Sequence, residues 1–457
     1  MSGRSKANRE RLRGSLVVVP ALAVVMAIAL GVLLPLFDRT ATDERFTLVL
    51  FGGGPDAARS VLGTVTGSVI TVASLTFSLT VITLQLASSQ FSPRLLRTFV
   101  RDRVTQVTLA VFLATFVYGL LVLRTVRSND DPGGGFVPRV AVTVAIVLAV
   151  LSTAALVTFL GHVTTVMRVD TLMRDVHSQT TKAIGQLYGE EPREVASSTT
   201  VPVPPPGARS LPAPQSGFVQ EMSAGSLLGP AARAGLVVRL DVSAGDHVIE
   251  GEPVGLAWTT AGTECPTDGQ LEGVTRAMRQ ALAIGFERTP RSDAAFGLRQ
   301  LVDIAAKALS PGVNDPTTAV HAVGHLAALL AGLAARDLGP EVVRDDEGMA
   351  RVVVRRPDFA ELLGLVCGQP RRYGAGEPAL VLALLELLAT VAGRVAATGD
   401  PERRRHVLDQ LDRLISDAER ETSNPLDLVG VRRLAADVRA TLLPGPERPA
   451  TSRSGRP

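Results

Sequence analysis

The sequence predicts an α-helical membrane protein with four transmembrane helices, followed by a cytoplasmic region that holds a small β module and a mainly α-helical domain. Two observations predict this fold class. Four apolar segments in the first third of the chain are each long enough to cross a bilayer as a helix. The remainder of the 457-residue chain mixes charged and apolar residues, as soluble domains do.

The four predicted spans cover residues 15–37, 61–90, 104–123 and 140–167. Each holds close to the roughly 20 apolar residues that a helix needs to cross a membrane. A basic tail over residues 1–14 precedes the first span, whose apolar run is too long for a cleaved signal peptide. We therefore expect the first span to remain as an anchor.

Basic residues in the loops predict the orientation. The N-terminal tail and the loop between the second and third spans are rich in arginine, whereas the first outer loop mixes both signs of charge. This bias favours a multi-pass protein with both termini in the cytoplasm. The even number of spans agrees, so the chain after residue 167 is predicted to be cytoplasmic.

The second span carries an unusual number of polar side chains. They recur at steps of three, four or seven residues and therefore share one face of a helix, here called the hydroxyl face: Thr64, Ser68, Thr71, Ser74, Ser78, Gln85 and Ser89. Hydroxyls in hydrocarbon need a partner, so this face predicts either a packed helix or a hydrated path. No acidic or basic residue lies deep in spans two to four, which favours a channel over a proton-coupled carrier.

The loop after the second span predicts an amphipathic helix in the membrane interface. Ser92 and Pro93 form a good helix start. Apolar residues then alternate with four arginines, namely Arg94, Arg97, Arg101 and Arg103. Two interpretations stay open: an interfacial anchor with snorkelling arginines, or a lever that joins spans two and three.

The cytoplasmic region begins with a helix and a proline-rich linker over residues 168–215. Short strand patterns follow over residues 216–262, where the sequence from Val242 to Gly251 resembles half of a biotinyl or lipoyl barrel-sandwich. This segment has no lysine, so a covalent biotin or lipoate is excluded and only a barrel-sandwich-like fold is implied. Helical patterns cover residues 268–443 apart from a hairpin-like segment from Glu341 to Arg355, and the composition predicts a disordered tail over residues 444–457.

One helix of this domain is apolar enough to be considered as a fifth span. The run from Ala379 to Gly393 has only about fifteen residues and is interrupted by Glu386. A buried core helix is therefore the favoured interpretation. A span here would place the C-terminus outside the cytoplasm.

The densest group of polar residues lies between residues 288 and 318. The candidates for a ligand or subunit contact are Arg288, Arg291, Asp293, Arg299, Gln300, Asp303, Asn314 and Asp315. Arg299, Asp303 and Lys307 follow each other at steps of four, which is also typical of a solvated salt-bridge face. As a ligand site, the arginines and the backbone N–H groups of the turn would match an anion.

Other site chemistry is not indicated. His321 and His325 are four residues apart, but the glutamate of a metalloprotease motif is missing, and we predict no metal and no cofactor. The cysteines, Cys265 and Cys367, match no redox or metal spacing. No nucleotide-binding, kinase or hydrolase motif is present, so enzymatic activity is not predicted. The net charge of +3, with both signs well mixed, gives no sign of nucleic-acid binding.

Two sequence blocks carry a resemblance to a known family. One runs from Thr76 to Arg94 and continues through Arg101-Asp102-Arg103-Val104-Thr105-Gln106. The other runs from Gly297 to Ala305 and continues through Leu309 to Pro316. Together they resemble the bacterial predicted membrane protein family called domain of unknown function 2254. The resemblance implies a bacterial inner-membrane protein, and it brings no activity, cofactor or catalytic residue.

Two classes of function follow from these features. The leading hypothesis is a homo-oligomeric channel-like or transport-related protein with a cytoplasmic regulatory domain. The alternative is a membrane-anchored sensing or assembly protein that conducts nothing. The predicted partners are the lipid bilayer and further copies of the chain, and an enzyme that uses His321, His325 or Asp303 is the least supported hypothesis.

Overall fold

The computed structural model describes residues 17–40, 50–90, 102–128, 135–166, 168–189, 201–262, 264–290 and 292–443. Within these residues the protein is mostly helical, with two β-sheets. It divides into two compact units, residues 1–172 and 173–457. Six of the described helices are long and apolar enough to cross a membrane, four in the first unit and two in the second.

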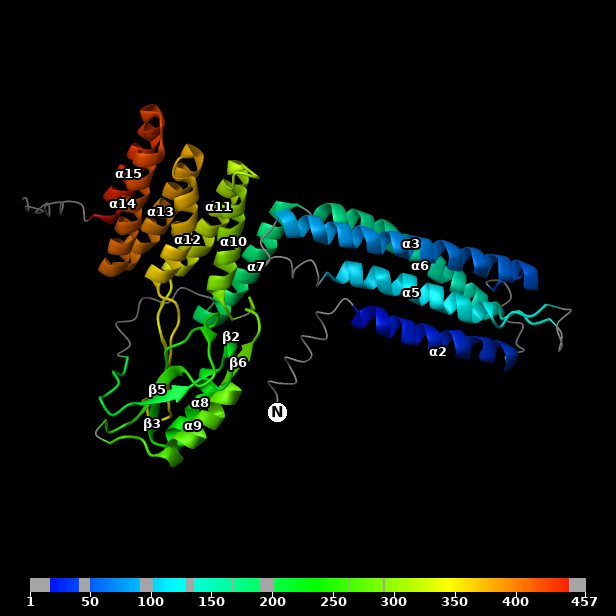
Figure 1. Cartoon of the computed structure of the whole chain (residues 1–457), viewed down its shortest axis with the longest axis horizontal. Helices are drawn as coiled ribbons and strands as arrows, with labels where there is room; N and C mark the ends of the chain where they lie inside the picture. Colours follow the sequence, from blue (N-terminus) through cyan, green and yellow to red (C-terminus); the bar gives the residue numbers. More distant parts are fainter. Residues whose placement is uncertain are drawn as a thin grey trace, which may run out of the picture. The chain divides into compact units, whose positions relative to one another are not determined.

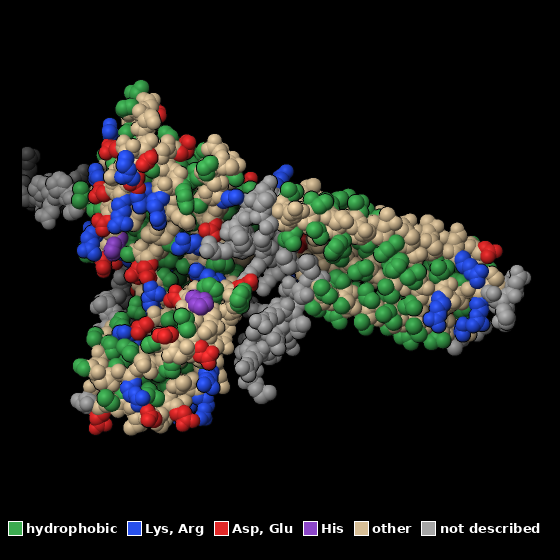
Figure 2. All heavy atoms as spheres, in the orientation of Figure 1, with side chains coloured by type: hydrophobic (Ala, Val, Ile, Leu, Met, Phe, Trp, Pro, Cys, Tyr) green, Lys and Arg blue, Asp and Glu red, His purple; other side chains and the backbone are tan. Residues whose placement is uncertain are grey.

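The described part of the first unit holds four long helices, whose ends lie within six residues of the predicted spans (Figure 1). They are α2 (Val18–Thr40), α3 (Pro55–Gln90), α5 (Arg103–Leu123) and α6 (Arg139–Val166). Helix α5 packs against each of the other three and buries the large side chains of Phe112 and Tyr118. Much of the outer surface is hydrophobic, as Figure 2 shows, which suits a lipid environment.

Polar contacts fix the start of α6 within this unit. Asp38, near the end of α2, accepts hydrogen bonds from the backbone N–H groups of Val140 and Ala141 at 3.2 and 3.1 Å. The carboxylate thus caps the first turn of a neighbouring helix. The hydroxyl of Tyr118 donates to the carbonyl of Ala141 at 2.9 Å and ties α5 to the same turn.

Several predicted segments lie outside the described residues. These are the basic tail over residues 1–14, most of the predicted interfacial helix and the tail over residues 444–457. Of the four arginines of that helix, Arg94, Arg97 and Arg101 are not described, and Arg103 is the first residue of α5.

The second unit holds two sheets. The larger has the strand order β1-β5-β3-β8-β7, with every neighbouring pair antiparallel except β3 and β8. Its strands are β1 (Arg209–Pro212), β5 (Pro253–Thr259), β3 (Leu236–Leu240), β8 (Ala350–Val354) and β7 (Glu341–Arg344). The smaller sheet is antiparallel with the order β4-β2-β6, formed by β4 (His247–Val248), β2 (Gly217–Met222) and β6 (Leu282–Gly285).

The strands predicted over residues 216–262 therefore pair with strands from outside this range. Strand β1 lies in the predicted linker, β6 lies in the predicted helical domain, and α8 (Ala224–Arg233) lies between two predicted strands. Strands β7 and β8 form the hairpin predicted from Glu341 to Arg355. The physical reason is burial: all residues of β3 except Arg239 are buried, and such a strand needs a neighbour on each side. Strands β5 and β8 supply those neighbours.

Helices complete the second unit (Figure 1). Helices α8 and α9 (Asp268–Ala281) pack on each other, and α8 also packs on β3 and β8. The others are α7 (Val169–Tyr188), α10 (Ala294–Ala308), α11 (Pro316–Ala334), α12 (Phe359–Gly374), α13 (Pro378–Thr398), α14 (Pro401–Glu421) and α15 (Leu428–Leu442). The apolar helix α13 packs against α11, α12, α14 and α15, which explains its composition.

Local sequence signals start several of these helices. Aspartate side chains accept backbone N–H groups of the first turn at Asp293, Asp315, Asp358 and Asp400. Each such cap satisfies a donor that the helix itself leaves unpaired. Helix α13 ends at Gly399, whose φ of 73° suits glycine.

Candidate functional site

Helix α3 turns its hydroxyl face away from its own bundle. The buried residues of α3 lie on the opposite side of the helix: Ala58, Leu62, Thr66, Val69, Ala73 and Thr76. Of the predicted face, Thr64, Ser68, Thr71, Ser74, Ser78 and Gln85 are all exposed, and the side chain of Ser89 lies outside the description. No helix of the described chain covers this face.

Small residues leave room for a second helix along the same side of α3. A methyl group added at Gly63 or Gly67 would meet nothing within 4 Å. Leu75 and Ile82 also lie on this side and interrupt the hydroxyls; their side chains are 69% and 51% exposed. The face is therefore a mixed surface, with hydroxyls and glycines towards the start of α3 and apolar interruptions further on.

The hydroxyls of this face differ in how they are satisfied. Thr64 and Thr71 donate to carbonyls of their own helix, at Ser60 and Gly67, over 2.8 and 2.9 Å. Among the described residues, the hydroxyls of Ser68, Ser74 and Ser78 have no hydrogen-bond partner. They are available to water or to another helix.

A second set of polar residues, which the sequence interpretation missed, lies inside the bundle. These residues are Thr66, Thr76, Thr105, Gln106, Thr108, Thr115 and Ser152. The hydroxyls of Thr115 and Ser152 lie 3.1 Å apart and join α5 to α6. The spacing of Thr105, Thr108 and Thr115, at three and seven residues, was the signal for this inner face of α5.

Asp102, which belongs to the first of the two sequence blocks, is the N-cap of α5. The Asp102 carboxylate accepts from the backbone N–H groups of Val104 and Thr105 at 3.1 and 3.2 Å, and from the Thr105 hydroxyl at 2.6 Å. Nε2 of His162 on α6 lies 2.9 Å from the same carboxylate. Asp102 therefore caps α5 and also connects it to the last turns of α6.

The eight predicted contact residues of the second unit do not form one site. Arg288 and Asp293 lie between β6 and α10, and Arg291 lies outside the described residues. Arg299, Gln300 and Asp303 lie on α10, and Asn314 and Asp315 lie in the turn before α11. The structure thus brings Arg288 and Asp293 together, and Asn314 beside Asp315 in a separate turn.

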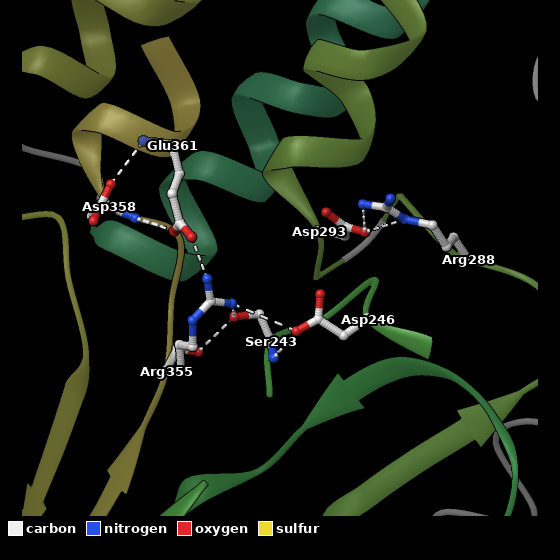
Figure 3. Close-up of polar contacts among 7 residues, drawn as sticks. All are labelled: Ser243, Asp246, Arg288, Asp293, Arg355, Asp358 and Glu361. Atoms are coloured by element: carbon white, nitrogen blue, oxygen red, sulfur yellow. Dashed lines mark hydrogen bonds and ion pairs between the residues drawn. The ribbon is translucent and has the colours of Figure 1, made fainter. Parts of the chain in front are cut away.

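Arg288 and Asp293 form an ion pair (Figure 3). Nε and Nη2 of Arg288 donate to Asp293 at 2.9 and 2.7 Å, and Asp293 also accepts the backbone N–H of Phe296 at 2.8 Å. Burial raises the pKa of Asp293 above its ordinary value, and the charge of Arg288 opposes that rise. Gly245, with φ of 95°, passes so close that a side chain there would overlap both groups.

Arg355 joins further polar groups beside this pair (Figure 3). It donates to the hydroxyl of Ser243 at 2.9 Å, lies 3.6 Å from Asp246 and forms an ion pair with Glu361. The polar joint is the name used here for the seven residues drawn: Ser243, Asp246, Arg288, Asp293, Arg355, Asp358 and Glu361. Its charged groups pair with one another across loops of the sheets and the starts of α10 and α12, which makes it a structural junction.

The turn before α11 is a helix-start motif. Asn314 has φ of 49°, a conformation that asparagine tolerates, and Asp315 follows as the N-cap. The Asp315 carboxylate accepts the hydroxyl and the backbone N–H of Thr318 at 2.6 and 3.1 Å. These hydrogen bonds favour the charged form, so the pKa of Asp315 lies below its ordinary value.

Val176, Thr180 and Ile184 of α7 are buried, and Thr180 lies against Gly297 of α10. A side chain at Gly297 of α10 would overlap the Thr180 hydroxyl, so the glycine is needed for this approach. This contact accounts for the glycine that opens the second sequence block.

His325 of α11 contacts His177 of α7. Their Nδ1 atoms lie 3.3 Å apart, and their ring centres lie 5.1 Å apart. Both side chains are half-buried, whereas His321 is exposed one turn away on α11. Among the described residues, no group of three or more histidine, cysteine, aspartate or glutamate side chains is placed to hold a metal ion.

The comparisons with known proteins agree with the membrane character of the first unit. The chain matches the family described as "Predicted membrane protein (DUF2254)" over residues 13–390. It is 40% identical over 454 residues to the "Uncharacterized protein Rv1290c" of Mycobacterium tuberculosis (strain ATCC 25618 / H37Rv), covering 99% of this chain and 84% of the relative. The same figures hold for the "Uncharacterized protein Mb1321c" of Mycobacterium bovis.

No solved structure gives a significant match. The match over residues 13–390 covers most of the first unit and the greater part of the second, and it includes both sequence blocks that resemble the family. The chain therefore belongs to the DUF2254 family of predicted membrane proteins.

Proposed function

We propose that the protein is the subunit of a homo-oligomeric, channel-like membrane protein in which the hydroxyl face of α3 borders a central path. The single observation that carries this proposal is that this face is exposed and that no described part of the chain covers it. In lipid, hydroxyls without partners are unfavourable, so a second copy or a column of water is the expected neighbour of Ser68, Ser74 and Ser78. Gly63 and Gly67 leave room for close approach of that neighbour.

In this proposal only α2, α3, α5 and α6 cross the membrane. In the other two candidate spans, α11 and α13, 50% and 56% of the residues in the most apolar 18-residue segment are buried within the protein. The corresponding shares for α2, α3 and α6 are 22%, 17% and 22%, as expected of helices that meet lipid. Helices α11 and α13 therefore belong to the core of a cytoplasmic domain.

The proposed membrane is the bacterial inner membrane, with both termini in the cytoplasm. Its support is the arginine-rich N-terminal tail and the arginine-rich loop between α3 and α5. The second unit then lies in the cytoplasm, where it acts as a regulatory domain. The predicted partners remain the lipid bilayer and further copies of the chain.

Ion flux through reconstituted vesicles tests the channel. Thr71→Leu and Ser78→Leu replace hydroxyls on the uncovered face by apolar side chains, and we expect each to lower the flux severalfold. Phe77→Leu is the matched control, because Phe77 is 59% exposed on the flank of the same helix and outside the hydroxyl face. A parent protein that conducts nothing, or equal flux in all three variants, would count against the proposal.

The alternative function, a membrane-anchored sensing or assembly protein, is favoured by one observation. The second unit has its own hydrophobic core, built from both sheets, α8 and α9. A soluble fragment that retains the cellular interaction would support this alternative. The fragment must begin near Val169, because Val176 and Thr180 of α7 are part of the packed structure.

A further inference from the structure

Two histidines far apart in the sequence meet on neighbouring helices of the second unit. His177 lies on α7 and His325 on α11, and they are 148 positions apart in the sequence. Their Nδ1 atoms face each other at 3.3 Å, and neither side chain is fully buried. The contact differs from the pair that the sequence suggested, His321 and His325, because it joins two helices instead of two turns of one.

Two imidazole nitrogens at this distance need a proton or a metal ion between them. A neutral imidazole has one protonated nitrogen and one with a lone pair, and two lone pairs that face each other repel. Either a proton is shared between the nitrogens or a metal ion binds both. Each of these removes the repulsion between the two nitrogens.

The observed distances fit a shared metal ion. Two imidazoles on one tetrahedral zinc ion, with zinc–nitrogen distances of about 2.0–2.1 Å, have their nitrogens about 3.3 Å apart and their ring centres about 5.2 Å apart. The observed separations are 3.3 and 5.1 Å. The same contact also satisfies the geometry of an N–H···N hydrogen bond, so the variants described below separate the two cases.

We propose that His177 and His325 bind one divalent transition-metal ion of the zinc, nickel or copper class and that the ion holds α7 on α11. Neutral imidazole prefers these ions, whereas magnesium and calcium prefer oxygen ligands. Water completes the coordination, since both side chains are partly open to solvent. With two protein ligands the ion exchanges with the medium, unlike the ion of a closed four-ligand zinc site.

The site has a mechanical consequence for α7. Only two residues separate the end of α6 at Val166 from the start of α7 at Val169. Helix α7 therefore follows directly on the last predicted span, and metal binding determines how firmly α7 is held on α11. This inference does not depend on whether α3 borders a conducting path.

The test is a titration of the full-length, metal-stripped protein in detergent with zinc, in which calorimetry measures the binding. We expect one saturable zinc ion per chain. His177→Gln and His325→Gln should each weaken zinc binding at least tenfold. His406→Gln on α14 and His247→Gln on β4 are the matched controls, and both should bind zinc as the parent does.

A pair of nearly isosteric variants separates metal binding from proton sharing. In His325→Asp a carboxylate oxygen replaces Nδ1 and is a zinc ligand, whereas in His325→Asn an amide oxygen accepts a hydrogen bond from His177 but is a poor zinc ligand. We expect the aspartate variant to bind zinc clearly more tightly than the asparagine variant. Equal zinc binding by these two variants, or by the parent and both glutamine variants, would overturn the proposal in favour of a shared proton.

Discussion

At the scale of single residues, Gly297 fixes how closely α7 approaches α10. A methyl group at this position would overlap the Thr180 hydroxyl, which is itself buried. We expect Gly297→Ala to cost about 1–3 kcal/mol of unfolding free energy, the usual effect of overpacking, and to lower the melting temperature.

Gly324→Ala on α11 is the matched control for this substitution. A methyl group there would meet nothing within 4 Å, so the melting temperature should stay the same or rise. Combining Gly297→Ala with Thr180→Ala should recover part of the loss, because the overlapping hydroxyl is removed. Equal melting of the two alanine variants would refute the close approach.

Asp315 provides a prediction about pH. Its folded-state pKa lies below the ordinary value of 3.8, because Thr318 donates two hydrogen bonds to the charged form. Its contribution to stability is therefore present above the unfolded-state pKa and is lost as the pH falls through the folded-state pKa. Asp315→Ala should cost about 1 kcal/mol at pH 7, as N-cap losses do.

Melting curves of the parent and of Asp315→Ala between pH 7 and pH 3 check this prediction. The two melting temperatures should differ at neutral pH and approach each other as the pH falls below 3.8, because the carboxyl group of the unfolded parent is protonated first and that of the folded parent only at lower pH. A difference that persists unchanged to pH 3 would show that the cap does not act through its charge.

At the scale of elements, hydropathy and helix starts were readable from the sequence, and partners distant along the chain were not. The predicted spans fall on the helices α2, α3, α5 and α6, because a run of about 20 apolar residues indicates a long apolar helix. Periodicity placed the hydroxyls on one face of α3, but it carries no information about which side the bundle covers.

The same limit applies to the second unit. Arg288 and Asp293 are near neighbours in sequence, whereas Arg355 reaches Ser243 across 112 residues, and no local pattern indicates such a contact. The parallel pairing of β3 with β8 is equally distant and was not predicted. Helix α8 was missed because it is short and contains Pro230, which weakens a helical pattern.

The uncovered face of α3 yields a prediction with a definite direction. If this face borders a path, the exposed Leu75 forms an apolar ring between hydroxyls, and apolar rings close a pore by excluding water. Leu75→Ser should therefore raise the ion flux severalfold in reconstituted vesicles. Phe77→Ser places the same polar group on the flank of α3 and should leave the flux unchanged; a rise in both would point to general leakiness.

At the scale of the whole molecule, the two units have separate hydrophobic interiors. In the first, the buried polar residues of the described chain are all uncharged, and Thr115 pairs with Ser152 across helices. In the second, charged residues are abundant, and the polar joint pairs them between loops and helix starts. This contrast is expected if the first unit meets lipid and the second meets water.

The two cysteines make the orientation of the whole chain measurable without introducing a new residue. Cys265 is exposed, whereas Cys367 is buried, and burial raises the pKa of the Cys367 thiol to about 12. Because the thiolate is the reactive form, a maleimide should label only Cys265 in the folded protein. Cys265→Ser should abolish the labelling, and Cys367→Ser should leave it intact.

A membrane-impermeant maleimide then reports the side on which the second unit lies. If both termini are cytoplasmic, the reagent labels Cys265 in inverted membrane vesicles and does not label it in intact spheroplasts. Detergent should abolish the difference between the two preparations, since it exposes both sides. Labelling in spheroplasts alone would place the second unit outside the cytoplasm, and it would then reverse the orientation that the arginine-rich loops predict.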